Sequence, residues 1–459
     1  MSSAASSAPN GGAHLRRTLT LWNLIIYGVI IIQPIAPMGI YGGIANKARG
    51  HVVTTILIAM VAMLFTALSY GKMARVYPSA GSAYTYVGSE LHPVLGYLTG
   101  WSMVMDYLLN PLICIIICSD LSRNLVPQIP QAMWAVFFGA MFTFMNLRGV
   151  QTSAKVNNWM AAIMSVVVVV FLVAAARHIL GMEPKVPGFY TEPFYNRSTF
   201  SWVAVGSGTS LAVLTYIGFD GISTLSEEVE NPRRNILLAT VLVCLVIGIL
   251  SAVEVYAAQL AMPWTKPLEH EDTAFVEVAR KIGGLKLFHL LNLTLLVANI
   301  GSGMGAQLGA ARLLYGMGRG NAIPKGFFGK VEPKSGVPAN NVMLIGALAL
   351  GGAFLMRMNY TMGAELLNFG ALIAFMGVNI AAFTRYFLRE KEWGFSGILF
   401  NLICPLAGFI ICAVIWWSLA HHTKVVGSCW LGAGVAYGAI KTRGFKKELV
   451  SFDPPPDAD

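Results

Sequence analysis

Two interruptions of apolar runs decide the fold of this sequence. The first reads Ile32-Gln33-Pro34-Ile35-Ala36-Pro37-Met38-Gly39, and the second reads Thr215-Tyr216-Ile217-Gly218-Phe219-Asp220-Gly221. Pro34 and Pro37 each remove a backbone donor and clash with the preceding turn, so a continuous helix is not expected there. In the second stretch two glycines bracket an aspartate within an apolar run. The sequence therefore predicts two discontinuous helices.

Apolar residues dominate the chain on both sides of these interruptions. Of 459 residues, 56% are hydrophobic and only 12% are charged, whereas about 25% are charged in soluble domains. The mean hydropathy is +0.63. We therefore expect a single membrane-embedded domain. The net charge of +10 fits the positive-inside bias of such a protein, and no nucleic-acid partner is expected.

The apolar runs predict an all-α protein with twelve transmembrane helices. Two further stretches, Gly81–His92 and Thr273–Gly283, are predicted as short amphipathic helices at the interface. The predicted spans are Leu21–Ala45, Val53–Val76, Leu95–Ser119, Ala132–Leu147, Val156–Ala176, Trp202–Leu225, Ile236–Met262, Leu287–Met317, Val342–Met356, Leu366–Phe383, Gly397–Leu419 and Val425–Ile440.

The distribution of charge and of the interruptions predicts how the chain is organised. Lys and Arg are more frequent on the side of the N-terminus, which places both termini in the cytoplasm. The interrupted first and sixth spans fit two inverted five-helix repeats whose broken helices meet near the midplane, the alternative being two simple kinks. The predicted division is a tail at 1–18, a core at 19–389 with repeats at about 19–178 and 200–389, two helices within 390–440, and a tail at 441–459.

Several motifs make the sequence resemble the amino acid–polyamine–organocation transporters. They are the stretch from Tyr216 to Glu228 followed by Asn231-Pro232-Arg233-Arg234-Asn235, the stretches Asn299–Met304 and Ala311–Arg319, and the stretch Pro78–Tyr84. The resemblance covers Leu19 to Arg389 and implies the leucine-transporter fold in a plasma membrane, with a bacterial inner membrane favoured. Gly100-Trp101 with Met105-Asp106-Tyr107-Leu108 looks most like the putrescine-importer branch.

Two carboxylates are the leading candidates for a cation site. Asp106 lies near the centre of the third span, where an ionisable group is costly unless it faces a partner, a cavity or a pathway. A structural hydrogen bond to a neighbouring Ser or Tyr is the alternative. Asp220 lies in the second interruption, where unwound backbone lets its side chain reach a central cavity beside Gly218 and Gly221.

The resemblance adds roles for neighbouring residues. It implies an acidic substrate residue at Asp220 and aromatic gates at Tyr216 and Phe219, for which ordinary helix packing is the alternative. Glu227 and Glu228 are predicted to form an inner gate with Arg75 or with other nearby arginines, unless they are solvated charges. The complete predicted substrate site is Gln33, Ile35, Ala36, Asp106, Tyr107, Tyr216, Gly218, Phe219, Asp220 and Gly221.

The first interruption departs from the amino-acid-transporting relatives. There a Gly-Ser-Gly-like break holds the substrate carboxylate through backbone N–H groups, whereas Pro34 and Pro37 cannot donate. An amine without a carboxylate, attracted by Asp106 and Asp220 and stacked on aromatic faces, fits better. We therefore predict a secondary transporter that imports putrescine or a related polyamine, with an amino acid permease or exchanger as the alternative. A membrane-embedded enzyme is disfavoured because the sequence has no HExxH or comparable motif, and an ATP-driven pump because it has no Walker motif. A channel is disfavoured because the polar residues concentrate at the two breaks.

The fifth span departs from the family as well. Met164 stands where many proton-coupled members have a lysine. Coupling must then use an acidic residue that exchanges a proton, or a sodium ion held by carbonyls of the first break and the Ser302 hydroxyl. Protons are favoured, with Asp106 ahead of Asp220 as the carrier, and helix packing is the alternative role of Ser302. No cofactor or metal site is expected, because the six cysteines lack metal-type spacing.

Overall fold

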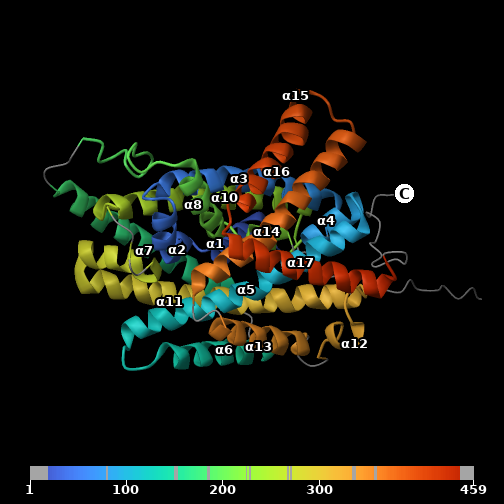
Figure 1. The fold of residues 1–459 in the computed structure, drawn as a ribbon, viewed down its shortest axis with the longest axis horizontal. Helices are drawn as coiled ribbons and strands as arrows, with labels where there is room; N and C mark the ends of the chain where they lie inside the picture. The colour runs from blue at the N-terminus through green and yellow to red at the C-terminus, as the bar shows by residue number, and fades with distance from the viewer. Residues whose placement is uncertain are drawn as a thin grey trace, which may run out of the picture.

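The computed structural model describes residues 19–78, 81–148, 154–182, 187–223, 225–226, 229–265, 268, 271–332, 337–355 and 359–444. In this part of the chain the protein is helical, and a parallel bridge between Leu19 and Val229 is its one extended pairing. The elements are α1 Leu21–Ile32, α2 Ala36–Lys47, α3 Val52–Val76, α4 Ser82–Glu90, α5 Pro93–Leu125, α6 Gln131–Leu147, α7 Ala154–Leu180, α8 Trp202–Ala212, η1 Val213–Thr215, α9 Phe219–Ser223, α10 Pro232–Ala261, η2 Glu271–Thr273, α11 Ala274–Arg319, α12 Lys325–Phe328, α13 Ala339–Leu355, α14 Tyr360–Ala382, η3 Phe383–Arg389, α15 Phe395–Gly397, η4 Ile398–Ile403, α16 Cys404–Trp417 and α17 His421–Thr442 (Figure 1).

The lengths and apolar composition of these helices make the chain a multi-pass membrane protein. Among the described residues, eight helices are long and apolar enough to cross a membrane, or nine if the bent pair α1–α2 counts as one span. The shorter apolar helices are α6 and α13. Helix ends agree with the sequence prediction to within a few residues in α3 and α6.

The first predicted interruption is confirmed. Helix α1 ends at Ile32 and α2 begins at Ala36, with a bend of 43° between them. Gln33, between the two helices, has φ 67° and ψ 124°, which lies outside the helical region. Proline at positions 34 and 37 explains the break, since neither residue can donate to the preceding turn.

The second predicted interruption is also confirmed. The sixth span consists of α8, the short η1 turn and α9, and the backbone is not helical between Tyr216 and Gly218. Gly218 has φ +119°, and a Cβ atom at this position would lie 2.4 Å from the Ile31 Cγ2 atom. Glycine is therefore required where the second break approaches the end of α1.

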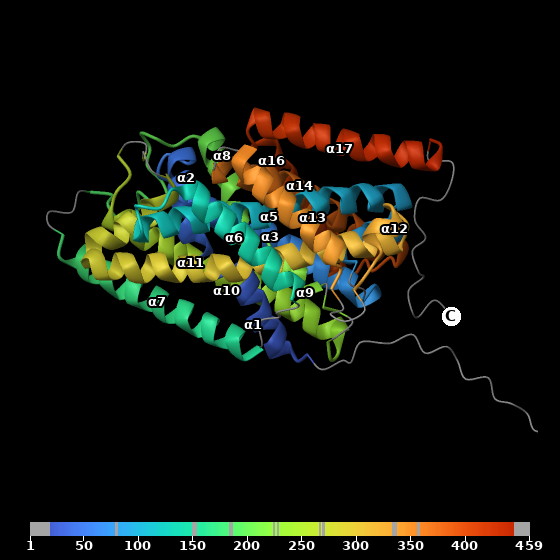
Figure 2. The ribbon, with the colours of Figure 1, turned by 90° about the horizontal axis from the view of Figure 1, so that it is seen from below.

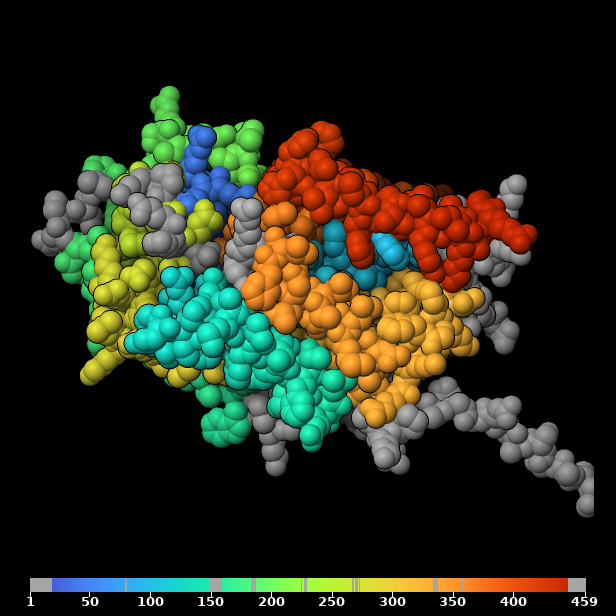
Figure 3. Space-filling model, turned by 60° about the horizontal axis from the view of Figure 1, so that its bottom comes forward, coloured from blue at the N-terminus to red at the C-terminus, as the bar shows by residue number. Residues whose placement is uncertain are grey.

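Helix α5 is the centre of the bundle, and α7 lies at its edge. In an 18-residue stretch of α5, 78% of the residues are buried, compared with 28% in α7. Figure 2 shows α7 and α17 at opposite edges, and Figure 3 shows α6 and α13 side by side on one face. Residues on α5 are therefore in position to reach both broken helices.

The segment 273–283 was predicted to be a separate short helix, and the structure agrees. It forms the first part of α11, which is divided from the rest by a kink. Gly284 inside α11 has φ 65° and ψ −163°, so the two parts meet at a kink. A glycine tolerates this conformation without a steric penalty, which is why the helix resumes directly after it.

A buried glutamate joins α4 to the end of α14 and η3. Glu90 is fully buried, accepts a 2.8 Å hydrogen bond from the Tyr77 hydroxyl and forms a 2.7 Å ion pair with Arg389 Nη1. Arg385 Nη1 lies 3.4 Å from the same carboxylate. Burial raises the pKa of Tyr77, so its hydroxyl stays protonated and can donate.

We expect Glu90→Gln to lower the free energy of unfolding by about 1–3 kcal/mol, because hydrogen bonds to a charged group become bonds to a neutral one. Thermal unfolding of the purified protein in detergent measures this. The control is Glu277→Gln, which removes an exposed pair with Arg280 at 3.8 Å and should cost less than about 1 kcal/mol. Equal losses in the two variants would contradict a stabilising role for Glu90.

Candidate substrate site

Two buried carboxyl groups meet between α5 and α9. Asp220 and Asp106 are 2% and 4% exposed, and the two groups are close enough to interact electrostatically. The Tyr107 hydroxyl donates to Asp220 Oδ2 at 3.2 Å, and the Gly218 N–H donates to Asp220 Oδ1 at 3.3 Å. We call Asp106 and Asp220 the carboxylate pair. The structure thus brings together two predicted site residues that are more than a hundred positions apart in sequence.

Aromatic side chains form one wall of the carboxylate pair. The Phe219 ring lies 5.4 Å from the Tyr70 ring and 5.2 Å from the Phe375 ring, and Tyr70 interacts electrostatically with both carboxyl groups. These rings form a buried aromatic cluster around the residue that precedes Asp220. Tyr216 is arranged differently, because its buried hydroxyl donates to the Ile56 carbonyl on α3 at 2.9 Å.

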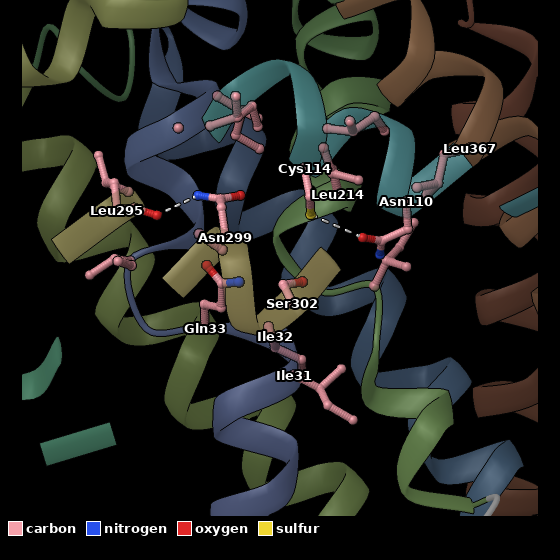
Figure 4. A pocket seen from close by; sticks show the side chains of 17 residues that line it. Ile31, Ile32, Gln33, Asn110, Cys114, Leu214, Leu295, Asn299, Ser302 and Leu367 are labelled. Atoms are coloured by element: carbon pink, nitrogen blue, oxygen red, sulfur yellow. Dashed lines mark hydrogen bonds between the residues drawn. The ribbon is translucent and has the colours of Figure 1, made fainter. Parts of the chain in front are cut away.

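A cavity lies at the break between α1 and α2, and we call it the amide cavity. The centres of water molecules can occupy about 70 Å³ of this cavity. It therefore has room for a few waters. Ile35 and Ala36 line it together with the helices α5 and α11, whereas Asp106 and Asp220 do not. The polar side chains that line it are Gln33, Asn110, Cys114, Asn299 and Ser302 (Figure 4).

Hydrogen bonds orient two of the amides in this cavity. Gln33 Nε2 donates to the Ala298 carbonyl at 3.0 Å. Asn299 Nδ2 donates to the Leu295 carbonyl at 2.8 Å (Figure 4). The amide nitrogens are therefore engaged, and among the described residues no donor reaches Gln33 Oε1 or Asn299 Oδ1. Opposite them, the Cys114 thiol donates to Asn110 Oδ1 at 3.5 Å.

Backbone donors are scarce at the same break. Pro34 and Pro37 have no N–H. Most of the other N–H groups from residue 33 to residue 38 already donate to nearby carbonyls, Gln33 to Val29 at 2.9 Å, Ala36 to Gln33 at 3.0 Å and Met38 to Ile35 at 3.0 Å. Ile35 alone remains without a backbone acceptor among the described residues. A substrate carboxylate would find little to bind here.

The carboxylate pair and the amide cavity are separated by an isoleucine side chain. Ile31 lines the cavity, and its atoms lie 2.4 Å and 3.6 Å from the positions that Cβ atoms on Gly218 and Gly221 would occupy. These two glycines flank Asp220.

Sequence reasoning missed the contacts that hold the far end of α2. Lys47 forms a buried ion pair with Glu365 on α14, and Glu365 also accepts a 2.8 Å hydrogen bond from the Thr423 hydroxyl. Asn46 Nδ2 donates to Glu271 Oε1 at 2.8 Å. These partners are distant in sequence, so no local pattern signalled them. Asn110 could have been found, because it follows Asp106 by four residues and so shares its helix face.

Arg75 and Met164 do not line the amide cavity. Arg75 Nε donates to the Arg233 carbonyl at 2.8 Å, at the start of α10. Glu227 and Glu228 lie outside the described residues, so the inner gate stays a prediction. Met164, the position of interest for coupling, is buried in α7.

Comparison with known proteins agrees with this architecture. The family model described as amino acid permease matches residues 20–435. The chain belongs to the amino acid permease family, within the amino acid–polyamine–organocation transporters. This confirms the resemblance drawn from the motifs, and it makes the protein a transporter and not an enzyme.

Several relatives of this permease have described substrates. It is 34% identical over 441 residues to the low-affinity putrescine importer PlaP of Escherichia coli K12, with 96% of each chain covered. It is 26% identical to the branched-chain amino acid permease BcaP of Lactococcus lactis, with 95% of this chain and 96% of the relative covered. It is 24% identical to the methylthioribose transporter of Bacillus subtilis, with 93% and 94% covered.

Proposed function

We propose that this permease imports a small organic cation, putrescine or a related polyamine, by alternating access. The observation that carries the proposal is a carboxylate pair next to a helix break with almost no free N–H donor. An ammonium group is a donor without acceptors, and a carboxylate is an acceptor without donors. The site therefore complements an amine, and a putrescine importer is among the relatives.

Amino acids are the competing substrate class, because one of the relatives is a branched-chain amino acid permease. Its carboxylate would need donors at the first break, where residues 34 and 37 are prolines and the adjacent N–H groups are engaged. Exchange of an amino acid for an amine would meet the same shortage. The local chemistry favours the amine.

The proposal includes an architecture and a coupling ion. We infer twelve spans, with repeats at about 19–178 and 200–389 related by inversion, and both termini in the cytoplasm of a bacterium. We infer proton coupling through Asp106, because its carboxyl is buried beside that of Asp220. The alternative is sodium, held near Ser302, which lines the amide cavity.

Competition between putrescine and ornithine tests the substrate class. The two molecules share an amine-bearing carbon chain, and ornithine adds a carboxylate. We expect labelled putrescine to exchange into liposomes containing the purified permease, and we expect ornithine to compete at least about tenfold less well, since a buried acceptor without donors loses 1–3 kcal/mol.

Branched-chain amino acids and empty liposomes are the controls. Ornithine or a neutral amino acid that competes better than every polyamine would overturn the substrate assignment. Putrescine counterflow that is absent from protein-free liposomes would support it.

A further inference from the structure

The polar groups of the amide cavity are acceptors held in place by the fold. Gln33 Oε1 and Asn299 Oδ1 are the free ends of amides whose nitrogens donate to the Ala298 and Leu295 carbonyls. Gln33 and Asn299 are 7% and 9% exposed, so water satisfies these oxygens only from within the cavity. In each amide the group bonded to a backbone carbonyl must be the nitrogen, because an amide oxygen cannot donate. This fixes which amide atom faces away from that carbonyl as the oxygen.

No charged group lines this cavity among the described residues, yet one lining residue, Asn110, shares the helix α5 with Asp106. Asn110 lines it one helical turn beyond Asp106 on α5, a rise of about 6 Å. Ile31 lines the cavity and packs against Gly218 and Gly221, which flank Asp220. The carboxylate pair, the Ile31 side chain and the amide oxygens thus follow one another. A molecule with a short apolar chain and a polar group at each end would match this sequence of groups.

The geometry points to a second ammonium site: Gln33 Oε1 and Asn299 Oδ1 bind the distal amino group of a diamine whose first amino group is held by the carboxylate pair. This inference rests on the proposed function and deepens it, because it assigns specificity for diamines over monoamines to two neutral amides. Neutral amide oxygens can hold this end, because hydrogen bonds from an ionised group are stronger than neutral ones.

Binding of labelled putrescine to the purified full-length permease tests the site, with unlabelled putrescine and n-butylamine as competitors. n-Butylamine has the same carbon chain and one amino group. The wild type should prefer putrescine by at least about tenfold, which corresponds to hydrogen bonds to a charged group. Equal competition by the two amines in the wild type would overturn the inference without the use of any variant.

Two variants locate the preference. Asn299→Leu and Gln33→Met keep the size of each side chain and remove its amide, and they leave no backbone group unsatisfied because Leu295 and Ala298 lie within the helix α11. Each should reduce the preference to about threefold or less by weakening putrescine and leaving n-butylamine unchanged. Asn292→Leu is the matched control, since Asn292 lies on α11 outside the cavity and donates to the Leu121 carbonyl at 2.8 Å.

The outcomes separate this inference from the proposed function. A preference that survives in both variants would place the second amino group elsewhere. Equal weakening of both amines, together with a changed sodium requirement, would show that the cavity holds an ion and not an ammonium. A wild-type permease that binds neither amine but binds an amino acid would instead overturn the proposed function.

Discussion

Asp220→Asn is expected to weaken putrescine binding at least tenfold, since a hydrogen bond to a charged group contributes about 1.5–3 kcal/mol. The fold should persist. An asparagine oxygen can still accept from the Gly218 N–H, which lies 3.3 Å from Asp220 Oδ1 in the native chain. The Nδ2 group that replaces Oδ2 is a donor, so the Tyr107 hydroxyl would turn to accept from it instead of donating. Removing a charge from a buried site also relieves a desolvation cost. Equilibrium binding of labelled putrescine and thermal unfolding separate the two effects.

Asp120→Asn is the matched control for this variant. Asp120 lies on the same central helix α5 and accepts a 2.5 Å hydrogen bond from Gln131 Nε2, remote from the carboxylate pair. It should retain native affinity. A well-folded Asp220→Asn protein with unchanged affinity would move the cation site, and Asp106 would be the next position to test.

The helix breaks could be predicted because they depend on local chemistry. Proline at 34 and 37 removes donors wherever the chain is placed, and Gly218 supplies a backbone angle that other residues avoid. Asp106 and Asp220 could be singled out for a related reason, since a carboxyl group deep in an apolar run needs a function or a partner. Tyr107 as the link between α5 and Asp220 depends on how the two helices pack, and only the structure gives this contact.

The amide cavity could not be predicted for the same reason. The role of Asn299 depends on which of its two amide atoms is engaged, and the answer comes from its bond to the Leu295 carbonyl. The orientation of the Gln33 amide depends on its hydrogen bond to the Ala298 carbonyl, which is 265 positions away in sequence. Lys47 and Glu365 are likewise 318 positions apart. Polar pairs between distant helices leave no periodic pattern, whereas breaks and buried charges do.

Asp106→Asn is expected to uncouple transport from the proton gradient. Asp106 lies on the long helix α5, whereas Asp220 lies on the short helix α9, next to the second helix break. A carboxyl group can bind a proton when the cation is absent and release it when the cation arrives, because a nearby positive charge favours the ionised form. Asparagine cannot exchange a proton. The variant should therefore lose accumulation of putrescine but keep counterflow, which needs no net driving force.

Uptake into liposomes with an acidic exterior and no sodium measures this coupling. The wild type should accumulate putrescine, and Asp106→Asn should only equilibrate it. Ser302→Ala is the informative control, because it removes the hydroxyl that a sodium ion would use while leaving the carboxylate pair intact. We expect Ser302→Ala to retain accumulation driven by protons. Uptake that requires sodium, ignores the pH gradient and is lost in Ser302→Ala would rule out the proton mechanism and assign coupling to the break between α1 and α2.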